Sequence, residues 1–401
     1  MGILLGALDI GTQTTSLVAG EVTDGKLAIL GRTETPTQGL KKGVIRDIDS
    51  VTAGIRRVCE AMSQEHRVDL VNVSTAFSCG DLRSLVRTGR VSLLPGHAIN
   101  QDDIEAAEEN AQSENAPDAP ETLLQRFRQK YLVNDQLVVS PTGMAGAELK
   151  ANVLELIAPR TALGSLQTAI HQAGLRLVDT VFSGLAAAEA VLDRKAQEDG
   201  AVVIDFGAGT VDYLAVCNGV IAAVGAIGVG GAHLTNDLAL AFQVTQKQAE
   251  EMKLARGAAM IQPDLANARH LLRTTFSTND RSVSVHAIQT VTTERVDETF
   301  RLVRDALRDV LPQVHGGIFL TGGTAALPLI AEQASAIFGK PCSLGVPVNV
   351  ANLPDALAQA PYRHATAVGI PAQIVRIAGR TTHFADEVDQ ISVRDPVEEK
   401  L

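Results

Sequence analysis

The chain has no tryptophan, and aromatic residues make up only 3% of its 401 residues. Its four cysteines, Cys59, Cys79, Cys217 and Cys342, stand far apart without a C-x-x-C pair. This spacing suggests neither a zinc site nor a disulfide framework. We interpret the cysteines as reduced thiols in the core of a cytoplasmic protein.

Clusters of lysine and arginine are also missing, and the formal net charge is −11 with a pI near 5.3. Binding to a phosphate backbone depends on clustered cations, so no nucleic-acid partner is expected. The N-terminus lacks a basic region, and its apolar run at residues 3–8 is too short to span a bilayer. A longer apolar segment at residues 213–231 contains Asn218-Gly219, a hairpin turn signal, and therefore predicts two strands. We expect no transmembrane helix.

The overall composition is that of a soluble globular protein. The chain has a mass of 42.3 kDa, with 45% apolar and 20% charged residues. A chain of this length can bury a large core, and two lobes are expected.

One short pattern occurs twice, as L-D-I-G-T at residues 8–12 and as I-D-F-G-A-G-T-V-D at residues 204–212. The apolar runs before and after each copy predict strands at residues 3–8, 16–22, 201–204 and 213–217. Each copy is therefore predicted to be the turn of a β-hairpin. Taken alone, such a pattern most often makes only a tight turn.

The residue types in both turns suit a phosphate group. Glycine lets the backbone approach closely, threonine adds a hydroxyl donor, and successive N–H groups can form an anion nest. An aspartate cannot face bare phosphate, because the like charges repel. A divalent cation is expected between them, and Mg²⁺ held by carboxylates, water and phosphate oxygens meets that requirement.

A third element follows at residues 318–323, where an apolar strand runs into Gly322-Gly323. The next segment, 325–338, has apolar residues at helical spacing, which predicts a helix. A strand, a glycine pair and a helix N-terminus can accept the flat face and the phosphates of a nucleotide.

These three elements, in this order, resemble the actin superfamily of ATPases. The resemblance implies an α/β fold of the actin-like type, with two ribonuclease-H-like lobes around a nucleotide cleft. It implies ATP and Mg²⁺ as ligands, with Asp9 and Asp205 organising the metal. The other implied nucleotide-binding residues are Gly11, Thr12, Gln13, Thr14, Gly207, Ala208, Gly209, Thr210, Asp212, Gly230, Gly231, Glu250, Lys253, Gly322 and Gly323.

Two of these assignments depend on further local resemblances. Residues 249–253 look like the helical A-E-x-x-K element of the superfamily, which places Glu250 and Lys253 on the ribose and adenine. Taken alone, this i,i+3 pair would more often be an exposed ion pair. Residues 228–231 resemble the glycine turn beside the nucleotide and precede a helix expected to begin near Thr235.

The connecting motifs of the superfamily are matched at residues 181–188 and 364–369. Some members carry a carboxylate in the first motif that positions the attacking water, and here that position is Ser183. Loss of a general base typically costs about 10²–10⁴ in rate, so ATP binding with at most slow hydrolysis is expected. His233 and His364 show no metal-ligand spacing, and we interpret them as structural.

The position of an insertion indicates the branch of the superfamily. A strand at 26–30 is followed closely by a helix at 49–64, so no domain is inserted there. Residues 78–161 instead leave room for a small domain, with strands expected at 86–94, 136–139 and 148–157 and a helix at 100–112. This transposed subdomain resembles FtsA and PilM, and the glycine-spaced loop at 39–51 favours FtsA. The resemblance runs from about residue 6 to about residue 372.

The resemblance gives a domain plan. We expect residues 1–80 and 162–199 as the first-lobe core, 81–161 as the inserted FtsA-type small subdomain, 200–235 and 311–375 as the second-lobe core, 236–310 as the small subdomain of the second lobe, and 376–401 as a flexible acidic tail. FtsA proteins usually end in a basic amphipathic helix on the inner membrane. From Ala372 to Leu401 this chain has four basic and six acidic residues. The net charge of this segment is therefore negative, and anionic lipid would not attract it. Membrane contact through a partner or an unrecognised tail, a soluble paralogue and a shortened chain are all left open.

Resemblance to FtsA also implies partners and a location. The protein would form head-to-tail filaments, bind the C-terminal peptide of FtsZ and contact other divisome membrane proteins. It would lie in the cytoplasm, peripheral to the inner face of the cell membrane at the division site. Arg295 and Glu298, on a helix expected at 295–310, match a partner-facing stretch, although such surface charges are more often merely solvated. The alternatives are a PilM-like platform for pilus assembly or a sugar or acetate kinase of the same fold. A chaperone is disfavoured because no substrate-binding domain follows.

Overall fold

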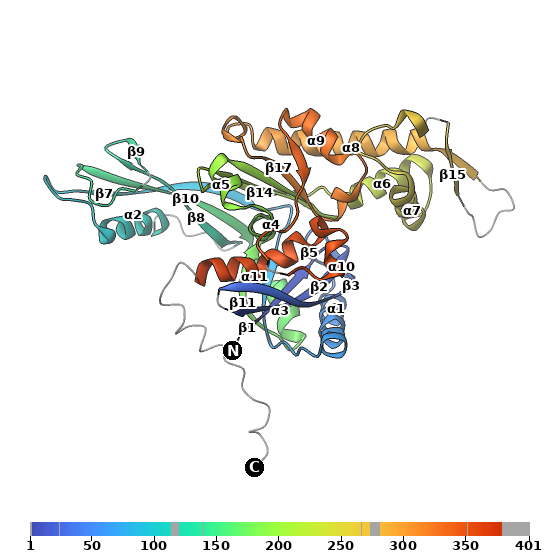
Figure 1. Cartoon of the computed structure of the whole chain (residues 1–401), viewed down its shortest axis with the longest axis horizontal. Coiled ribbons are helices and arrows are strands. Elements are labelled where there is room, and N and C mark those ends of the chain that lie inside the picture. The colour runs from blue at the N-terminus through green and yellow to red at the C-terminus, as the bar shows by residue number, and fades with distance from the viewer. Residues whose placement is uncertain are drawn as a thin grey trace, which may run out of the picture.

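The structure is a computed structural model that describes residues 2–23, 25–113, 120–138, 140–265, 267–272, 281–350 and 352–378. Two lobes, each built on a five-stranded sheet, lie on either side of a pair of helices, and a third sheet projects from one end (Figure 1). The predicted tail at 376–401 falls almost wholly outside the described residues.

The first lobe contains the sheet β11-β6-β1-β2-β3. Its strands are β1 (Ile3–Ile10), β2 (Thr14–Thr23), β3 (Lys26–Pro36), β6 (Asn72–Phe77) and β11 (Arg176–Phe182). Strands β1, β2 and β3 form an antiparallel meander, whereas β6 and β11 add parallel strands on the other side of β1. A two-stranded ribbon, β4 (Leu40–Lys41) and β5 (Val44–Ile45), precedes α1.

The second lobe repeats this plan as the sheet β14-β13-β12-β17-β18. Its strands are β12 (Ala201–Phe206), β13 (Val211–Cys217), β14 (Val220–Ile227), β17 (Gly317–Thr321) and β18 (Cys342–Leu344). Again the first three strands form an antiparallel meander, and the last two are parallel to the first. The duplicated turns predicted from the sequence therefore occupy the same topological position in two equivalent sheets.

Helix α1 (Ile48–Ala61) covers one face of the first sheet. Asp47 caps its N-terminus by accepting a hydrogen bond from the Ser50 backbone N–H at 3.2 Å. The apolar residues Val51, Ile55 and Val58 share one face of this helix and are buried. The helix then continues as a π-helical turn, Met62–His66.

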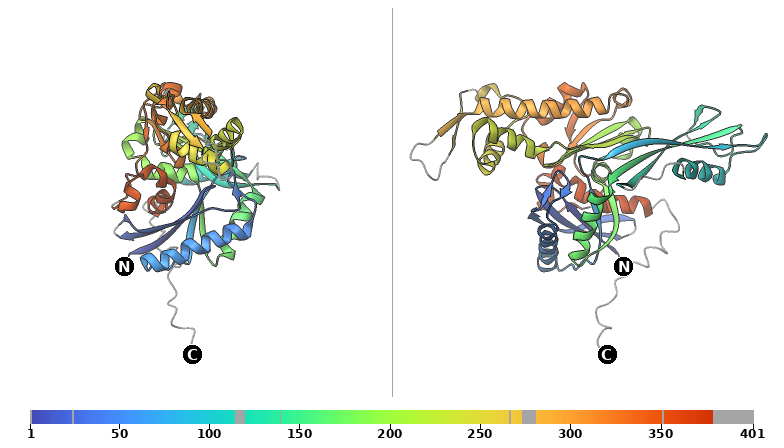
Figure 2. Two further views of the ribbon diagram at one scale, coloured as in Figure 1. Left: turned by 90° about the vertical axis from the view of Figure 1, so that its right-hand side faces the viewer. Right: turned by 180° about the vertical axis from the view of Figure 1, so that it is seen from behind.

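Two helices, α4 (Ser183–Val191) and α11 (Ala365–Ala378), pack against each other and lie between the lobes in both views of Figure 2. They cross very closely, since a Cβ on Gly369 would lie 1.7 Å from the Ala186 carbonyl oxygen. Helix α3 (Arg160–Gln172) covers the first lobe beside α1, and α5 (Arg194–Asp199) leads into β12. Helices α4 and α11, which cross, connect the two lobes of the molecule.

The inserted subdomain is an antiparallel sheet, β7-β10-β8-β9, with helix α2 (Gln101–Ser113) on one face. Its strands are β7 (Arg83–Ser92), β8 (Glu121–Val133), β9 (Gln136–Val138) and β10 (Glu148–Pro159). The sequence analysis did not predict β8, whose polar residues hide its alternation. Arg126 on β8 and Arg87 on β7 both pair with Glu155 on β10, whose side chain is 2% exposed. Pairing with a buried carboxylate lets a charged strand occupy the middle of this sheet.

The small subdomain of the second lobe contains α6 (Gly231–Phe242), α7 (Gln246–Arg256), a hairpin of β15 (Arg269–Leu272) and β16 (Arg281–Ser284), and α8 (Val285–Ala306). In Figure 1 it extends away from the inserted subdomain, toward the opposite end of the molecule. The remaining elements are η2 (Pro263–Leu265), η3 (Leu311–Gln313), η4 (Gly323–Ala326), α9 (Ile330–Phe338), α10 (Asp355–Ala358) and η5 (Pro361–His364).

Three predicted helix boundaries were wrong. The helix expected at 325–338 is a 3₁₀ turn followed by α9, because Pro328 disfavours helix at the preceding residue and Leu329 has a left-handed backbone with φ 62°. The helix expected near Thr235 begins at Gly231. The helix expected at 295–310 begins at Val285, since burial of Val285, Ile288 and further residues on the same face outweighs the β-propensity of that segment.

Candidate functional site

A cavity of about 740 Å³ lies between the two lobes. Residues from both hairpin turns, from the glycine pair after β17 and from helix α7 line it. All of the predicted nucleotide-binding residues line this cavity except Gly230 and Gly231. Its volume is within the range of small-molecule binding pockets.

The two hairpin turns have the same backbone geometry. The Gly11 N–H donates to the Thr14 carbonyl at 3.0 Å, and the Gly207 N–H donates to the Thr210 carbonyl at 3.0 Å. The turns also face each other closely, because a Cβ on Gly209 would lie 2.2 Å from the Thr12 hydroxyl oxygen. A larger residue at position 209 would push the two lobes apart at this point.

The glycine pair after β17 approaches the second turn. Gly322 has φ 89°, and a Cβ there would lie 2.4 Å from a carboxylate oxygen of Asp205. Both facts require glycine at this position. The Thr324 hydroxyl donates to the Gly207 carbonyl at 3.0 Å, which ties the third element to the second turn.

Gly230 and Gly231 lie behind the second turn instead of lining the cavity. The Gly231 N–H donates to the Gly207 carbonyl at 3.0 Å. A Cβ on Gly230 would lie 2.6 Å from the Ala208 carbonyl oxygen, so a side chain here would displace that turn. The two glycines, at the start of helix α6, therefore pack against the second turn and support its backbone.

Glu250 and Lys253 form a partly buried ion pair, with 2.8 Å between the Lys253 Nζ and the Glu250 Oε2. Lys253 is 8% exposed and also donates to the Thr235 hydroxyl at 2.9 Å and to the Gly231 carbonyl at 3.2 Å. Across the cavity, the Gln13 amide donates to Glu250 at 3.5 Å. The alternative of a plain exposed ion pair is therefore wrong for Lys253.

Three carboxylates converge on the cavity: Asp212 is buried, and Asp9 and Asp205 are partly buried. Burial, followed by the charge of Asp205, raises the pKa of Asp9 to about 7. Burial also raises the pKa of Asp205, against an opposing hydrogen bond from the Thr366 hydroxyl at 2.7 Å. The pKa of Asp212 is raised well above its ordinary value by burial and by Asp205.

This set of donors fits a divalent cation that is completed by other ligands. In the described part of the chain, no group of three or more His, Cys, Asp or Glu side chains could hold a metal by itself. A cation between Asp9 and Asp205 would need phosphate oxygens and water to fill its coordination shell, which is the preference of Mg²⁺. Such a cation would also relieve the repulsion that raises the pKa of Asp9.

Several residues that line the cavity were not predicted from the sequence as site residues; among them are Arg32, Glu34, Ser78 and Thr366. Ser78 follows β6 and donates a short hydrogen bond to Asp212 in the other lobe. Ser183 lines the cavity at the start of α4, as the first connecting motif implies. Arg32, Glu34 and Ser78 belong to no local motif, so only the packing of β3 and β6 against the hairpins could reveal them.

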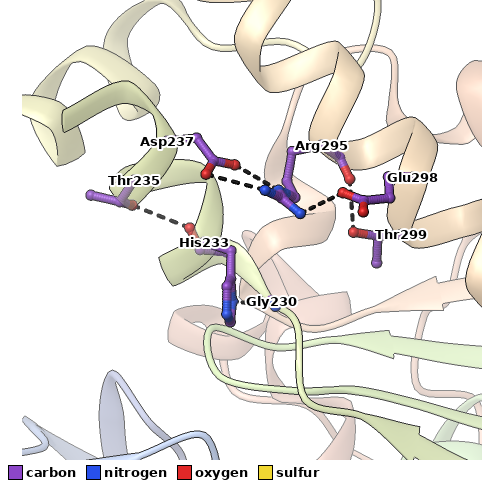
Figure 3. A network of polar contacts seen from close by, with 8 residues as sticks. Gly230, His233, Thr235, Asp237, Arg295, Glu298 and Thr299 are labelled. Atoms are coloured by element: carbon purple, nitrogen blue, oxygen red, sulfur yellow. Dashed lines mark hydrogen bonds and ion pairs between the residues drawn. The ribbon is translucent and has the colours of Figure 1, made fainter. Parts of the chain in front are cut away.

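The two predicted partner-binding residues lie on α8 (Figure 3), and neither lines the cavity. Arg295 binds Asp237 on α6 through two hydrogen bonds of 2.6 and 3.2 Å, and it also pairs with Glu298. The Glu298 side chain is 59% exposed. This network fixes the orientation of the guanidinium group and leaves the carboxylate of Glu298 accessible.

Neither histidine is part of a metal cluster in the residues that the structure describes. The His233 Nδ1 accepts a hydrogen bond from the Gly230 N–H at 3.1 Å, which caps the N-terminus of α6 (Figure 3). Burial, followed by the charge of Arg32, lowers the pKa of His364 to about 4. His364 is therefore neutral near pH 7.

Two equivalent sheets, crossing helices between them and a cavity lined by paired acidic turns together define an actin-like protein. Within that class, the chain belongs to the FtsA family of cell division proteins. The family model described as "Cell division protein FtsA" matches residues 202–369, and the one described as "SHS2 domain inserted in FTSA" matches residues 80–156. The finer segment boundaries predicted from the sequence remain predictions.

Curated relatives agree with this assignment. The chain is 32% identical to the cell division protein FtsA of Pseudomonas aeruginosa, over 92% of this chain and 88% of the relative. It is 30% identical to FtsA of Neisseria meningitidis, over 94% of this chain and 91% of the relative. The transposed subdomain and the hairpin motifs thus identified the correct branch.

Solved structures show the same fold at lower identity. A chain of the PilM-PilN type IV pilus biogenesis complex superposes with a TM-score of 0.66 at 18% identity, covering 92% of this chain and 98% of that one. MreB5 of Spiroplasma citri bound to ADP superposes with a TM-score of 0.54 at 15% identity, covering 96% and 98%. In the part of the chain that the structure describes, no helix has both the length and the apolar character needed to cross a bilayer.

Proposed function

We propose that this actin-like cell division protein binds Mg²⁺·ATP in the cavity between its lobes. The observation that carries the proposal is the pairing of two equivalent acidic turns across that cavity, with Gly209 against Thr12 and with Asp9 electrostatically coupled to Asp205. Backbone N–H groups of both turns would hold the phosphates, Asp9 and Asp205 would hold Mg²⁺ through its shell, and Glu250 and Lys253 would contact the ribose and adenine. The metal would supply charge neutralisation of the phosphates.

Hydrolysis is proposed to be slow, because Ser183 occupies the position where a carboxylate would orient water. Nucleotide would then act as a conformational ligand that stabilises the closed arrangement of the lobes. The Ser78–Asp212 hydrogen bond joins the two lobes, which supports this proposal. Closed molecules present matched ends, and head-to-tail contacts that do not close into a ring generate filaments.

Isothermal titration calorimetry with ATP, with and without Mg²⁺, tests the binding proposal. Wild-type protein should bind ATP in a Mg²⁺-dependent manner, and Asp205→Asn should weaken the Mg²⁺-dependent part. Asp305→Asn is a suitable control because its carboxylate is 61% exposed on the surface. Failure of the wild type to bind any adenine nucleotide would overturn the proposal.

The proposed partner is the C-terminal peptide of FtsZ, bound by the small subdomain through the surface around Arg295 and Glu298. The fixed guanidinium of Arg295 and the exposed Glu298 carboxylate support this choice. Fluorescence anisotropy with the labelled peptide should show weaker binding for Arg295→Ala. Arg301→Ala is the matched control. Arg301 lies on the same helix, forms an ion pair with Asp297, and has a side chain that is 60% exposed. Equal binding by both variants would argue against this surface.

The alternative is a pilus-assembly platform, suggested by the structural similarity to PilM. Binding of a peptide from a pilus-assembly membrane protein, but not of the FtsZ peptide, would favour that alternative. We further propose that the protein acts at the cytoplasmic face of the membrane at the division site, together with other divisome membrane proteins. Electron microscopy on a lipid monolayer should show filaments with ATP and FtsZ, and the absence of any ordered polymer would favour the platform.

A further inference from the structure

Arg32 is a partly buried cation of the cavity that none of the paired motifs contains. It lies on β3, the outer strand of the first sheet, and lines the cavity together with Asp9, Ser16 and Glu34. Its side chain is 13% exposed. An arginine buried to this extent normally has a counter-ion or a ligand in a definite place.

The strand register explains how Arg32 reaches the cavity. Asp9 on β1 lies opposite Ser16 on β2, and Ser16 lies opposite Glu34 on β3. Side chains two residues apart on a strand share a face, so Arg32 lies on the same face of the sheet as Glu34. The sheet therefore carries this arginine on the face from which Asp9 enters the cavity.

The hydrogen bonds of Arg32 are incomplete. One Nη atom pairs with Glu34, whose side chain is 52% exposed. The Nε atom is buried and, among the described residues, has no hydrogen-bond partner. A buried donor without a partner destabilises the folded protein, and a ligand that accepts its hydrogen bond in the cavity would remove that cost.

The charges around Arg32 leave it available to an anion. Its charge opposes the rise in the pKa of Asp9, and no other cation is among the causes that shift the pKa values of Asp9, Asp205 and Asp212. Lys253 is buried and also lines the cavity, but it is already bound to Glu250 and two further oxygens. His364 nearby is neutral at pH 7, because its pKa is lowered to about 4.

We propose that Arg32 binds the phosphate chain of the nucleotide at its metal-bound end, next to Asp9. The inference rests on the proposed nucleotide function and adds a cationic phosphate ligand from a strand outside the paired turns. A guanidinium group suits this role, because its planar fork of donors matches phosphate oxygens. Glu34 positions that fork by holding one of its ends.

Binding constants for ATP, ADP and AMP, measured by calorimetry with Mg²⁺, test the inference. The variants are Arg32→Met, which keeps the length of the side chain, and Arg32→Lys, which keeps the charge and loses the fork. Arg194→Met is the matched control, because Arg194 is 93% exposed in an i,i+4 ion pair outside the cavity. Thermal unfolding without nucleotide reports whether each variant folds.

Loss of charged hydrogen bonds should weaken ATP binding by Arg32→Met about ten- to hundredfold. The loss should be smaller for ADP and absent for AMP, since the contact is with the distal phosphates. Arg32→Lys should show the same order with smaller losses, which keeps the test decisive if Arg32→Met does not fold. The control should bind all three nucleotides as the wild type does.

Equal losses for ATP, ADP and AMP would assign Arg32 a purely structural role and overturn the inference, as would unchanged binding of all three. In both cases wild-type binding of ATP would leave the proposed function intact. Failure of the wild type to bind ATP would overturn the proposed function and this inference with it.

Discussion

Asp9 should make the nucleotide-free protein less stable as the pH rises, and replacing it with asparagine should remove that effect. Its folded-state pKa is raised from 3.8 to about 7, chiefly by burial and then by Asp205. Between these two values the folded protein keeps a proton that the unfolded chain has released. Stability from this group is therefore fully present below about pH 4 and lost as the pH rises through about 7.

The size of the effect follows from the shift in pKa. One pKa unit corresponds to about 1.4 kcal/mol, so a shift of this size amounts to ~4 kcal/mol in the free energy of unfolding. That is a large fraction of the net stability of a typical protein domain. Asp9→Asn replaces the carboxylate with a neutral group of the same shape, and at pH 8 the variant should be more stable than the wild type by up to this amount.

Urea unfolding of the nucleotide-free proteins from pH 5 to pH 8 measures this difference. Other groups titrate in both proteins, so the difference between wild type and Asp9→Asn is the relevant quantity. It should grow with pH, and addition of Mg²⁺·ATP should reduce it by stabilising the wild type more than the variant. Parallel pH profiles for the two proteins would refute the reasoning, because Asp9 would then be ionised without penalty. Asp305→Asn should follow the wild type at every pH.

Two further predictions concern the packing between the lobes and within the inserted subdomain. Gly369→Ala should lower the free energy of unfolding by about 1–3 kcal/mol or more, because its Cβ would overlap a backbone carbonyl of α4. Gly164→Ala on α3 should instead raise it by about 0.5–1 kcal/mol, since there is open space around that position and alanine favours helix; chemical denaturation of both variants checks the opposite signs. Glu155→Gln should lower the free energy of unfolding by about 3–5 kcal/mol, because it leaves two arginines without their buried carboxylate. Glu121→Gln, in an ion pair whose arginine is 61% exposed, should change it by less than about 1 kcal/mol, and similar losses for both glutamate variants would contradict this account.

The actin-like class and the FtsA branch could be predicted because their signals are local. Each acidic turn, with the strands on either side of it, occupies a short stretch of sequence. The first glycine of each turn, Gly11 or Gly207, contacts a carbonyl oxygen of the same turn, at Thr14 or Thr210. The transposed subdomain showed itself as a gap in the chain between two predicted elements. Such features need no knowledge of distant contacts.

Helix boundaries and one whole strand could not be predicted in the same way. Strand β8 is rich in charged residues, and its place in the sheet depends on Glu155, a carboxylate on a neighbouring strand. The start of α8 at Val285 depends on burial against the rest of its subdomain. In both cases tertiary contacts decided against the local propensity.

The sequence by itself determined the two acidic hairpin turns, the glycine pair and the order in which they occur, because each is formed by residues close together in the chain. Only the tertiary structure decided that Arg32, Ser78 and Thr366 join Asp9, Asp205 and Asp212 in one cavity. These residues come from strands and helices far apart in the sequence. The register of the sheets and the crossing of α4 with α11 bring these residues together. Their spacing along the chain does not predict that they lie in the same cavity.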